Sequence, residues 1–232
     1  MRQLNRSLLV FLLVLLPLAA WSGETAFVAQ EQIAFAKLLP PPPAVGSAVQ
    51  QEEMALLLTL QQERTPAMEA FALADAERNV FRFADAVGAD FTAAKLPKTT
   101  AFFEKVKENA DALLGPAKKH WDRPRPYASN PALNPCVPKP NNASYPSGHS
   151  TFGTVDSIIL ANMVPERATQ IYERAEAYRF NREIGGVHYP SDVAAGRIAG
   201  TVIAAFLQQS PAFQEAYAAA RAETRQVLGL PQ

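Results

Sequence analysis

Apolar side chains recur at helical spacing along most of this 232-residue chain, and this periodicity limits the folds open to it. Apolar residues three, four and seven positions apart lie on one face of a helix. No alternating run of the kind that a half-buried strand requires interrupts the pattern, and no internal repeat is visible. The chain is long enough for one sizeable core and short for two. The sequence therefore predicts an all-α, single-domain helical bundle.

Capping and breaking residues divide the periodic pattern into separate helices. Thr99 or Thr100 is a suitable N-cap, Gly115 and Pro116 are expected to end the helix that follows, and Ser147 can cap the next one. The expected helices cover residues 51–64, 67–86, 99–115, 147–163, 165–184, 191–206 and 211–228. Residues 120–147 are rich in proline and asparagine, so we expect one long ordered loop there, with a functional role.

The first 22 residues have the features of a secretory signal peptide. Arg2 and Arg6 provide the positive end, residues 8–20 provide an uncharged apolar run, and Ala20 and Ser22 are small residues at a candidate cleavage site. The alternative is a retained membrane anchor, but the run is short for a span of about 20 residues. We therefore expect export to the periplasm and no stable membrane association after cleavage.

A proline-rich arm is expected between the signal peptide and the helical domain. Four consecutive prolines at 40–43 cannot form a helix and favour an extended polyproline segment. The predicted organisation is therefore a signal peptide at 1–22, a proline-rich N-terminal arm at 23–50 that lies on the domain surface, and a helical domain at 51–232. A disordered linker is the alternative for the arm.

Charge and cysteine content exclude several classes of function. The formal net charge is zero, so no basic excess indicates nucleic-acid binding. Cys136 is the only cysteine and cannot form an internal disulfide, so it is either buried and inert or open to intermolecular pairing, and we expect the former. With one cysteine and three histidines, a thiolate zinc site is essentially excluded, and we expect no metal and no cofactor.

Three spaced motifs carry the polar chemistry. They are Lys118 with Arg125-Pro126 seven residues later, Pro146-Ser147-Gly148-His149, and Arg182 followed by His188 and Asp192. In this order and spacing they resemble the signature of the type 2 phosphatidic acid phosphatase superfamily, which includes bacterial class A non-specific acid phosphatases and vanadium haloperoxidases. The signal peptide, the chain length and the proline arm resemble the class A acid phosphatases most closely. The resemblance implies the helical bundle of the acid phosphatase and haloperoxidase type.

Spacing also chooses between two Arg-Pro pairs. The residue seven before Arg125 is Lys118, whereas the residue seven before Arg123 is Pro116. Arg125 and Lys118 are therefore the pair that matches the motif, and Arg123 is interpreted as a neighbour that adds positive potential. Asn181 departs from the serine that many members have before the arginine.

The residue types suit a phosphate dianion. Lys118, Arg125 and Arg182 provide fixed positive donors, and a guanidinium group can bind two oxygens at once. Ser147 and Gly148 lie at a predicted helix start, where free backbone N–H groups and the helix dipole attract an anion. Together these five residues are predicted to bind phosphate.

The resemblance implies a phosphohistidine mechanism with His188 as nucleophile and Asp192 as the acid that orients its ring. His149 is then the general acid that protonates the leaving oxygen. A histidine in a helical protein is more often structural, and for His120 we keep that interpretation.

The sequence therefore predicts an exported, metal-independent acid phosphatase that hydrolyses small-molecule phosphate monoesters. Alternatives are a lipid or isoprenoid pyrophosphate phosphatase, a vanadium-dependent haloperoxidase, and a non-catalytic phosphate-binding protein. Assembly into a homo-oligomer stays open.

Overall fold

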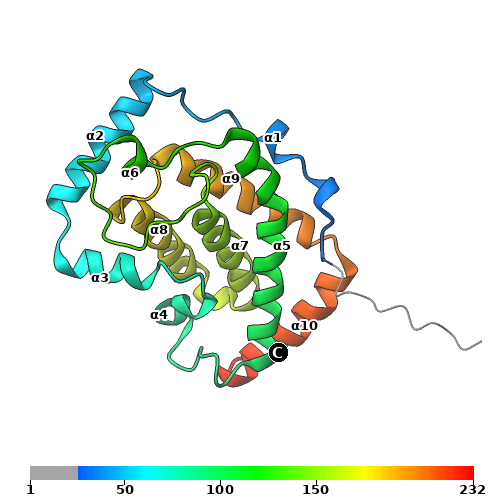
Figure 1. Ribbon diagram of the computed structural model, residues 1–232. Coiled ribbons are helices and arrows are strands. Elements are labelled where there is room, and N and C mark those ends of the chain that lie inside the picture. Colours follow the sequence, from blue (N-terminus) through cyan, green and yellow to red (C-terminus); the bar gives the residue numbers. More distant parts are fainter. Residues whose placement is uncertain (1–25) are drawn as a thin grey trace, which may run out of the picture.

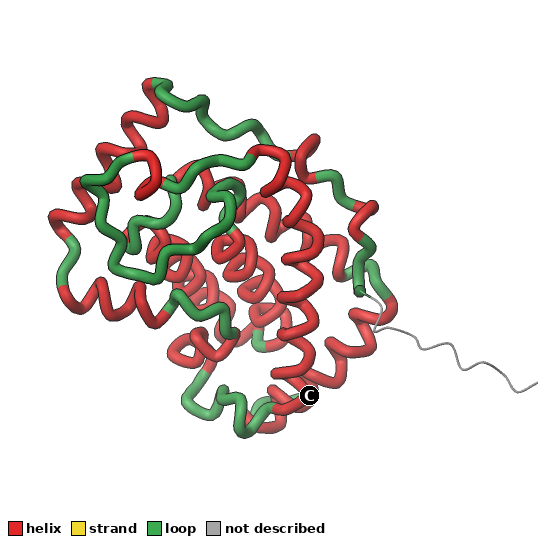
Figure 2. Tube along the Cα trace, in the orientation of Figure 1, coloured by secondary structure: helices red, strands yellow, loops and turns green. Residues whose placement is uncertain are grey.

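The computed structural model describes residues 26–232, which form helices joined by loops, with no strand in that range (Figures 1 and 2). The expected all-α fold is therefore confirmed for the described part of the chain. The expected signal peptide at 1–22 lies outside the described residues. The helices are α1 (Phe35–Leu38), α2 (Ala48–Glu63), α3 (Pro66–Ala74), α4 (Ala84–Val87), α5 (Pro97–Trp121), α6 (Pro126–Ser129), α7 (Gly148–Met163), α8 (Ala168–Ile184), α9 (Pro190–Leu207) and α10 (Pro211–Val227). Short 3-10 turns occupy Gln30–Gln32, Val80–Phe83 and Pro165–Arg167.

Helix α7 is the centre of the fold. It packs against α8 and α9, and the long helix α5 runs beside it (Figure 1). Helix α10 covers the N-terminal end of α5. Twelve of its 16 residues are buried, so it is covered on nearly all sides. Val155, Ile159 and Leu160 are fully buried and belong to the main apolar core. The position of α7 matters for function because its first turn carries the Pro-Ser-Gly-His motif.

Two glycines of α9 allow it to approach α7 closely. A Cβ atom added to Gly196 would lie 2.5 Å from the carbonyl oxygen of Ser147, and one added to Gly200 would lie 2.7 Å from the carbonyl oxygen of Thr151. Both distances are far inside van der Waals contact. The absence of a side chain at these positions therefore fixes the spacing between α9 and the start of α7.

Ser147 caps α7 as the sequence predicts. Its hydroxyl accepts a hydrogen bond from the backbone N–H of Ser150 at 3.2 Å. The ends of α8, α9 and α10 also lie close to their predicted positions, and a separate 3-10 turn precedes α8.

The prediction that Gly115 and Pro116 end a helix is wrong. Helix α5 continues through both residues to Trp121 and so carries Lys118 in its last turn. A proline inside a helix leaves the carbonyl four residues earlier without its partner. That carbonyl belongs to Ala112, which is exposed to water, while Leu113, Leu114 and Ala117 are buried and hold both sides of the interruption against the core.

The single helix expected over 67–86 is also wrong, because the chain breaks between α3 and the turn at 80–83. Asp75 ends α3 and is fully buried, where it accepts hydrogen bonds from Arg82, Arg174 and Asn181. A helix continuing past this point could not hold that carboxylate in place. The break instead brings the loop at 75–79 to the first turn of α7.

The N-terminal arm packs on the domain rather than lying only on its surface. Phe27, Val28, Ile33, Phe35 and Leu39 are buried in the main core cluster. The Asn109 side chain of α5 holds the arm through two hydrogen bonds to the backbone of Val28, at 2.9 and 2.8 Å. The Tyr145 hydroxyl donates to the carbonyl of Pro40.

Cys136 is half-buried, not buried as expected, and is a free thiol. Burial raises the pKa of this thiol, which keeps it protonated and unreactive at neutral pH. Among the described residues, no helix combines the length and the apolar character needed to cross a membrane.

Candidate active site

A pocket of about 280 Å³ opens where α5, α7 and the long loop at 122–147 meet. Five of the eight predicted site residues line it: Lys118, Arg125, Gly148, His149 and His188. The other three, Ser147, Arg182 and Asp192, are buried. The remaining lining residues are Arg78, Asp111, Leu114, Gly115, Pro140 and Asn142.

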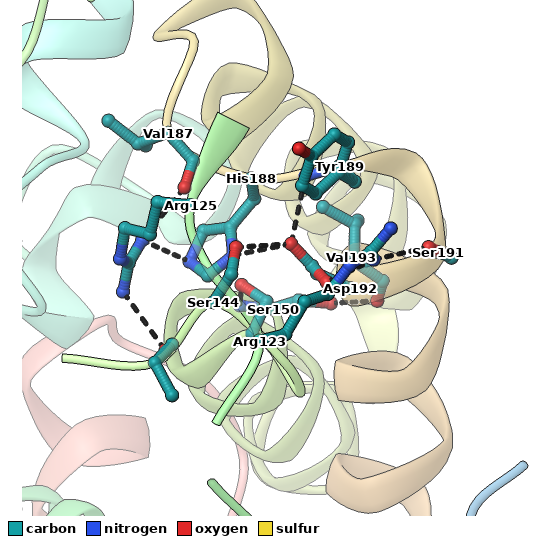
Figure 3. Close-up of polar contacts among 12 residues, drawn as sticks. Arg123, Arg125, Ser144, Ser150, Val187, His188, Tyr189, Ser191, Asp192 and Val193 are labelled. Carbon is teal, nitrogen blue, oxygen red and sulfur yellow. Dashed lines mark hydrogen bonds and ion pairs between the residues drawn. The ribbon is translucent and has the colours of Figure 1, made fainter. Parts of the chain in front are cut away.

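His188 lies between an arginine and a carboxylate (Figure 3). Its Nδ1 atom is 3.3 Å from Oδ2 of Asp192, four residues later at the start of α9. A carboxylate is an acceptor, so the hydrogen of the neutral ring lies on Nδ1. Nε2 therefore carries the lone pair, and Arg125 Nη1 donates to it at 3.1 Å. The ring presents its lone pair on the side of the pocket.

The Asp192 carboxylate is held by several donors. Oδ2 accepts from the Ser144 hydroxyl at 2.5 Å and from the backbone N–H of Tyr189 at 2.9 Å. The Ser144 hydroxyl also lies 3.4 Å from Nδ1 of His188. Asp192, Ser144 and His188 are at most 1% exposed, so water does not compete for these contacts.

The second carboxylate oxygen connects the site to helix α2, a link that the motifs do not indicate. Arg123 Nη1 donates to Oδ1 of Asp192 at 2.6 Å, and Arg123 Nη2 donates to Glu53 at 2.9 Å. Glu53 also accepts from the backbone N–H of Ser191 at 2.6 Å, and the Arg123 guanidinium lies 4.0 Å from the centre of the Tyr189 ring. Arg123 is 3% exposed and binds two acids, so its charge is used within this buried network rather than at the pocket.

Arg125 joins the long loop to His188. Nε donates to the backbone carbonyl of Asn142 at 2.8 Å and Nη2 donates to its side-chain oxygen at 2.7 Å, while Nη1 donates to the carbonyl of Val187 at 2.8 Å. Burial lowers the pKa of Arg125, but a guanidinium stays charged at neutral pH. The proline-rich loop is therefore ordered by the same side chain that faces the nucleophile candidate.

Lys118 reaches the pocket from the last turn of α5, and its Nζ donates to the carbonyl of Ala143 at 2.8 Å. Burial, followed by the nearby charge of Arg125, lowers the pKa of Lys118 to about 7. An anion bound between these two cations would raise that pKa again.

Arg182 supplies unused donors. It is 1% exposed, yet its Nε and Nη1 atoms have no hydrogen-bond partner among the described residues. Burial lowers the pKa of Arg182 to about 10, and its charge helps to lower the pKa of both His149 and His188. Buried charged donors without partners are costly, which points to an anionic ligand.

The start of α7 provides backbone donors, although one of the two predicted is already engaged. The N–H of Ser147 donates to the carbonyl of Asp192 at 3.0 Å. Gly148 and His149 begin the helix, where N–H groups have no acceptor within the helix. The backbone N–H groups left for an anion at this turn are therefore those of Gly148 and His149, while the N–H of Ser147 fixes the turn against α9.

His149 is oriented by the loop at 75–79. Its Nε2 lies 2.9 Å from the carbonyl of Ala76, so Nε2 carries the hydrogen and Nδ1 is the other ring nitrogen. Burial, and then the charge of Arg182, holds the pKa of His149 well below its usual value of 6.5.

Three further observations complete the site. Asn181, which departs from the expected serine, donates to buried Asp75 at 2.8 Å and so supports α8 beside Arg182. His120 is exposed and lies outside the pocket, beside Trp121. Across residues 26–232, no group of three or more His, Cys, Asp or Glu side chains is arranged to hold a metal ion.

The PAP2 superfamily model matches residues 109–215, a range that contains all three motifs. The family resemblance predicted from those motifs is confirmed.

Curated relatives include acid phosphatases. A non-specific acid phosphatase of Salmonella typhimurium is 40% identical over 114 residues, which cover 46% of this chain and 44% of the relative. One of Salmonella typhi is 35% identical over 147 residues, covering 61% of this chain and 58% of the relative. An acid phosphatase of Zymomonas mobilis is 32% identical over 121 residues, covering 50% and 46%. The chain thus aligns with about half the length of these relatives.

Two solved structures share the fold. A bacterial vanadium-dependent iodoperoxidase superposes with a TM-score of 0.59 at 18% identity, covering 76% of this chain and 53% of that one. A transmembrane PAP2-type phosphatidylglycerolphosphate phosphatase from Bacillus subtilis gives 0.54 at 20% identity, covering 78% and 90%. At these identities the likeness establishes the fold alone, and it confirms the predicted fold type.

Proposed function

We propose that this chain is a metal-independent acid phosphatase that acts on small-molecule phosphate monoesters through a phosphohistidine intermediate. Its residues 109–215 match the PAP2 superfamily model. One observation carries the proposal. His188 is oriented through Nδ1 by a buried carboxylate, and its Nε2 lone pair faces a pocket lined by Lys118 and Arg125. A site that only binds phosphate does not need a nucleophile with an orienting acid.

In the first step, Nε2 of His188 attacks phosphorus, the N–P bond forms and the P–O bond to the leaving group breaks. His149 gives its proton to the departing oxygen, which leaves as an alcohol or a phenol. The Nδ1 hydrogen stays on His188, and its bond to Asp192 stabilises the positive charge that develops on the ring. In the second step, water attacks the phosphohistidine, His149 takes a proton from that water, and inorganic phosphate and neutral His188 are released.

The cations stabilise charge on the transferring phosphoryl group. Lys118, Arg125 and Arg182 would grip its oxygens, with the N–H groups of Gly148 and His149 at the helix start. Arg182 has the clearest capacity, because its Nε and Nη1 have no other partner among the described residues. Arg125 Nη1 would shift from Nε2 of His188 to a phosphate oxygen as the anion enters.

The test is hydrolysis of a chromogenic aryl phosphate in excess EDTA. Wild type should turn over, and His188→Ala should lose activity by at least about a thousandfold, because the covalent step is removed. His120→Ala is the matched control, since that histidine is exposed and lies outside the pocket. Substrate labelled with ³²P should also give an acid-labile phosphoprotein that His188→Ala lacks. Full activity in His188→Ala would remove the proposed nucleophile.

We further propose export to the periplasm and cleavage of a signal peptide near residue 22. The basic residues and the apolar run at 1–20 support this. Cell fractionation should place the activity in the periplasm, and N-terminal sequencing of the purified enzyme should begin close to residue 23. Activity confined to the cytoplasm or to the membrane fraction would contradict it.

A further inference from the structure

Two charged residues line the pocket and have no part in the proposed mechanism. Arg78 lies on the loop between α3 and the turn at 80–83, and Asp111 lies on α5. The Arg78 guanidinium donates from Nη1 and Nη2 to the two carboxylate oxygens of Asp111, at 2.5 and 2.7 Å. This two-pronged pair joins two elements across the side of the pocket and has a fixed geometry.

The pair lies next to the predicted phosphate site. A Cβ atom placed on Gly148 would be 3.9 Å from Arg78 Nη1 and 3.8 Å from Cε of Lys118. Arg78 and Lys118 therefore flank the same glycine at the start of α7. The Arg78 side chain is 29% exposed and that of Asp111 is 46% exposed, whereas His188 is 1% exposed. The pair thus lies closer to solvent than the nucleophile candidate in the same pocket, on the side where the leaving group of a bound ester would extend.

Charge decides what such a subsite accepts. Asp111 is the one acid among the residues that line this pocket, and it cancels the charge of Arg78. A second anion on the leaving group would lose hydration there and find no net positive charge to compensate it. Hydroxyl groups can donate to the carboxylate and accept from the guanidinium without disturbing that balance.

We propose that Arg78 and Asp111 form the leaving-group subsite and select phosphate monoesters whose leaving group is neutral and bears hydroxyl groups over esters whose leaving group carries a further negative charge. The proposal rests on the proposed function and identifies the substrate class of that site. Asp111 is its discriminating residue, because its carboxylate neutralises a cation that would otherwise attract a second anion.

The two halves of the pair should act in opposite directions. Asp111→Asn keeps the shape of the side chain and leaves Arg78 as a free cation, so esters with anionic leaving groups should gain. Arg78→Gln leaves the Asp111 carboxylate without its partner, so the same esters should lose. A purely structural role would weaken both kinds of substrate together.

The experiment compares glycerol 3-phosphate with 3-phosphoglycerate, which differ by an alcohol against a carboxylate on the same three-carbon leaving group. The measured quantity is the ratio of kcat/KM for the first substrate to that for the second. Wild type should favour glycerol 3-phosphate. Asp111→Asn should lower the ratio about tenfold and Arg78→Gln should raise it about tenfold, as one uncompensated charge at a half-exposed site allows.

Glu104→Gln is the matched control. Glu104 is an exposed acid on the same helix, pairs with Lys107 and lies outside the pocket. The kcat/KM ratio of this variant should therefore equal that of wild type. Ratios that stay at the wild-type value in both pocket variants, or that move in the same direction, would overturn the subsite while leaving the phosphatase intact. Failure of wild type to hydrolyse any monoester, aryl phosphate included, would instead overturn the proposed function.

Discussion

At the scale of single residues, the two pocket histidines differ in which ring nitrogen is held. Asp192 holds Nδ1 of His188, and the carbonyl of Ala76 holds Nε2 of His149. Burial is the main cause that lowers the pKa of each ring well below 6.5, and neighbouring cations add to it. In the proposed mechanism one ring must be neutral to attack and the other charged to donate, so the same shift has opposite consequences for the two roles.

We predict that kcat/KM for an aryl phosphate is highest below pH 6.5 and falls above its optimum. His188 has a lowered pKa, so it stays neutral into the acid range. His149 also has a lowered pKa, so its protonated form is lost as pH rises through a value below 6.5, and kcat/KM falls by about tenfold per pH unit beyond it. The measurement is a pH–rate profile corrected for the second ionisation of the substrate, near pH 6.

His149→Gln provides the control for that profile. The variant should be slower, and its corrected kcat/KM should no longer fall through the range below pH 6.5, because the histidine that titrates there is gone. A fall that begins near pH 7 should remain, because burial lowers the pKa of Lys118 to about 7 and the loss of its charge weakens phosphate binding. A wild-type profile that climbs above pH 6.5 would contradict the role of His149 as general acid.

Sequence motifs predicted the central residues of this site but not those that support them. Lys118, Arg125, His149 and His188 were recognisable because they lie in three motifs whose order and spacing resemble the superfamily signature. Glu53, Ser144, Arg78 and Asp111 belong to no such spacing. Their places depend on which helices meet, as when α2 brings Glu53 to Arg123, 70 residues away. The sequence indicated Arg123 as a cation near the site, but it could not indicate that Arg123 binds Asp192 and Glu53 in a buried network.

At the scale of elements, the contact between α7 and α9 sets the geometry of the first turn of α7. Gly196 faces the carbonyl of Ser147, whose own N–H is bonded to the Asp192 carbonyl. Ser150 adds a hydrogen bond from its hydroxyl to the carbonyl of Val193 at 2.6 Å. Helix α9, which carries Asp192, is therefore in backbone contact with the start of α7.

Gly196→Ala is predicted to damage stability and activity together. The added methyl group would lie 2.5 Å from the Ser147 carbonyl and 2.7 Å from Cβ of Ser150, so one helix must move. Overpacking of this kind costs about 1–3 kcal/mol of unfolding free energy. A shift of the first turn of α7, where we propose that phosphate binds, should lower kcat/KM about tenfold to a hundredfold. Denaturant unfolding and steady-state kinetics measure the two effects.

Gly115→Ala is the comparison for stability. Gly115 is also helical, but a Cβ atom there would meet nothing within 4 Å, so alanine should raise the unfolding free energy by about 0.5–1 kcal/mol. Equal stability of Gly196→Ala and wild type would show that α7 and α9 tolerate a wider spacing than their glycines indicate.

Helix existence was predictable from periodicity, whereas two helix boundaries were not. Gly115 and Pro116 are ordinary stop signals, and they were overridden because Leu113, Leu114 and Ala117 are buried on either side. The break after α3 carries no glycine or proline. It follows from the pairing of Asp75 with Arg174 on α8, about a hundred positions later, which no local pattern encodes.

At the scale of the whole molecule, the N-terminal arm is part of the core. Five of its apolar side chains, Phe27, Val28, Ile33, Phe35 and Leu39, are buried against α5 and its neighbours. Polyproline character indicated an extended arm, but the sequence alone could not choose between a covering segment and a linker. The place where the arm packs depends on α5 and α10, which lie far along the chain.

A chain that begins at Ala48 is predicted not to fold stably. Burial of an apolar side chain contributes about 1.5–3 kcal/mol, so losing five approaches or exceeds the net stability of about 5–15 kcal/mol that is usual for a domain. Circular dichroism and thermal unfolding of the shortened protein should show loss of the cooperative transition. A chain beginning at residue 26 retains the arm and should melt normally; a stable, cooperative protein starting at Ala48 would refute the arm's contribution.

The close seating of α9 against α7 also has a consequence for the order of events during biosynthesis. His188 and Asp192 follow α7 in the chain, so they reach the first turn of α7 only when α9 docks against it. On the proposed function, a polypeptide that ends before α9 lacks Asp192 and should not hydrolyse phosphate esters. The proposed catalysis therefore requires α9 to be docked on α7.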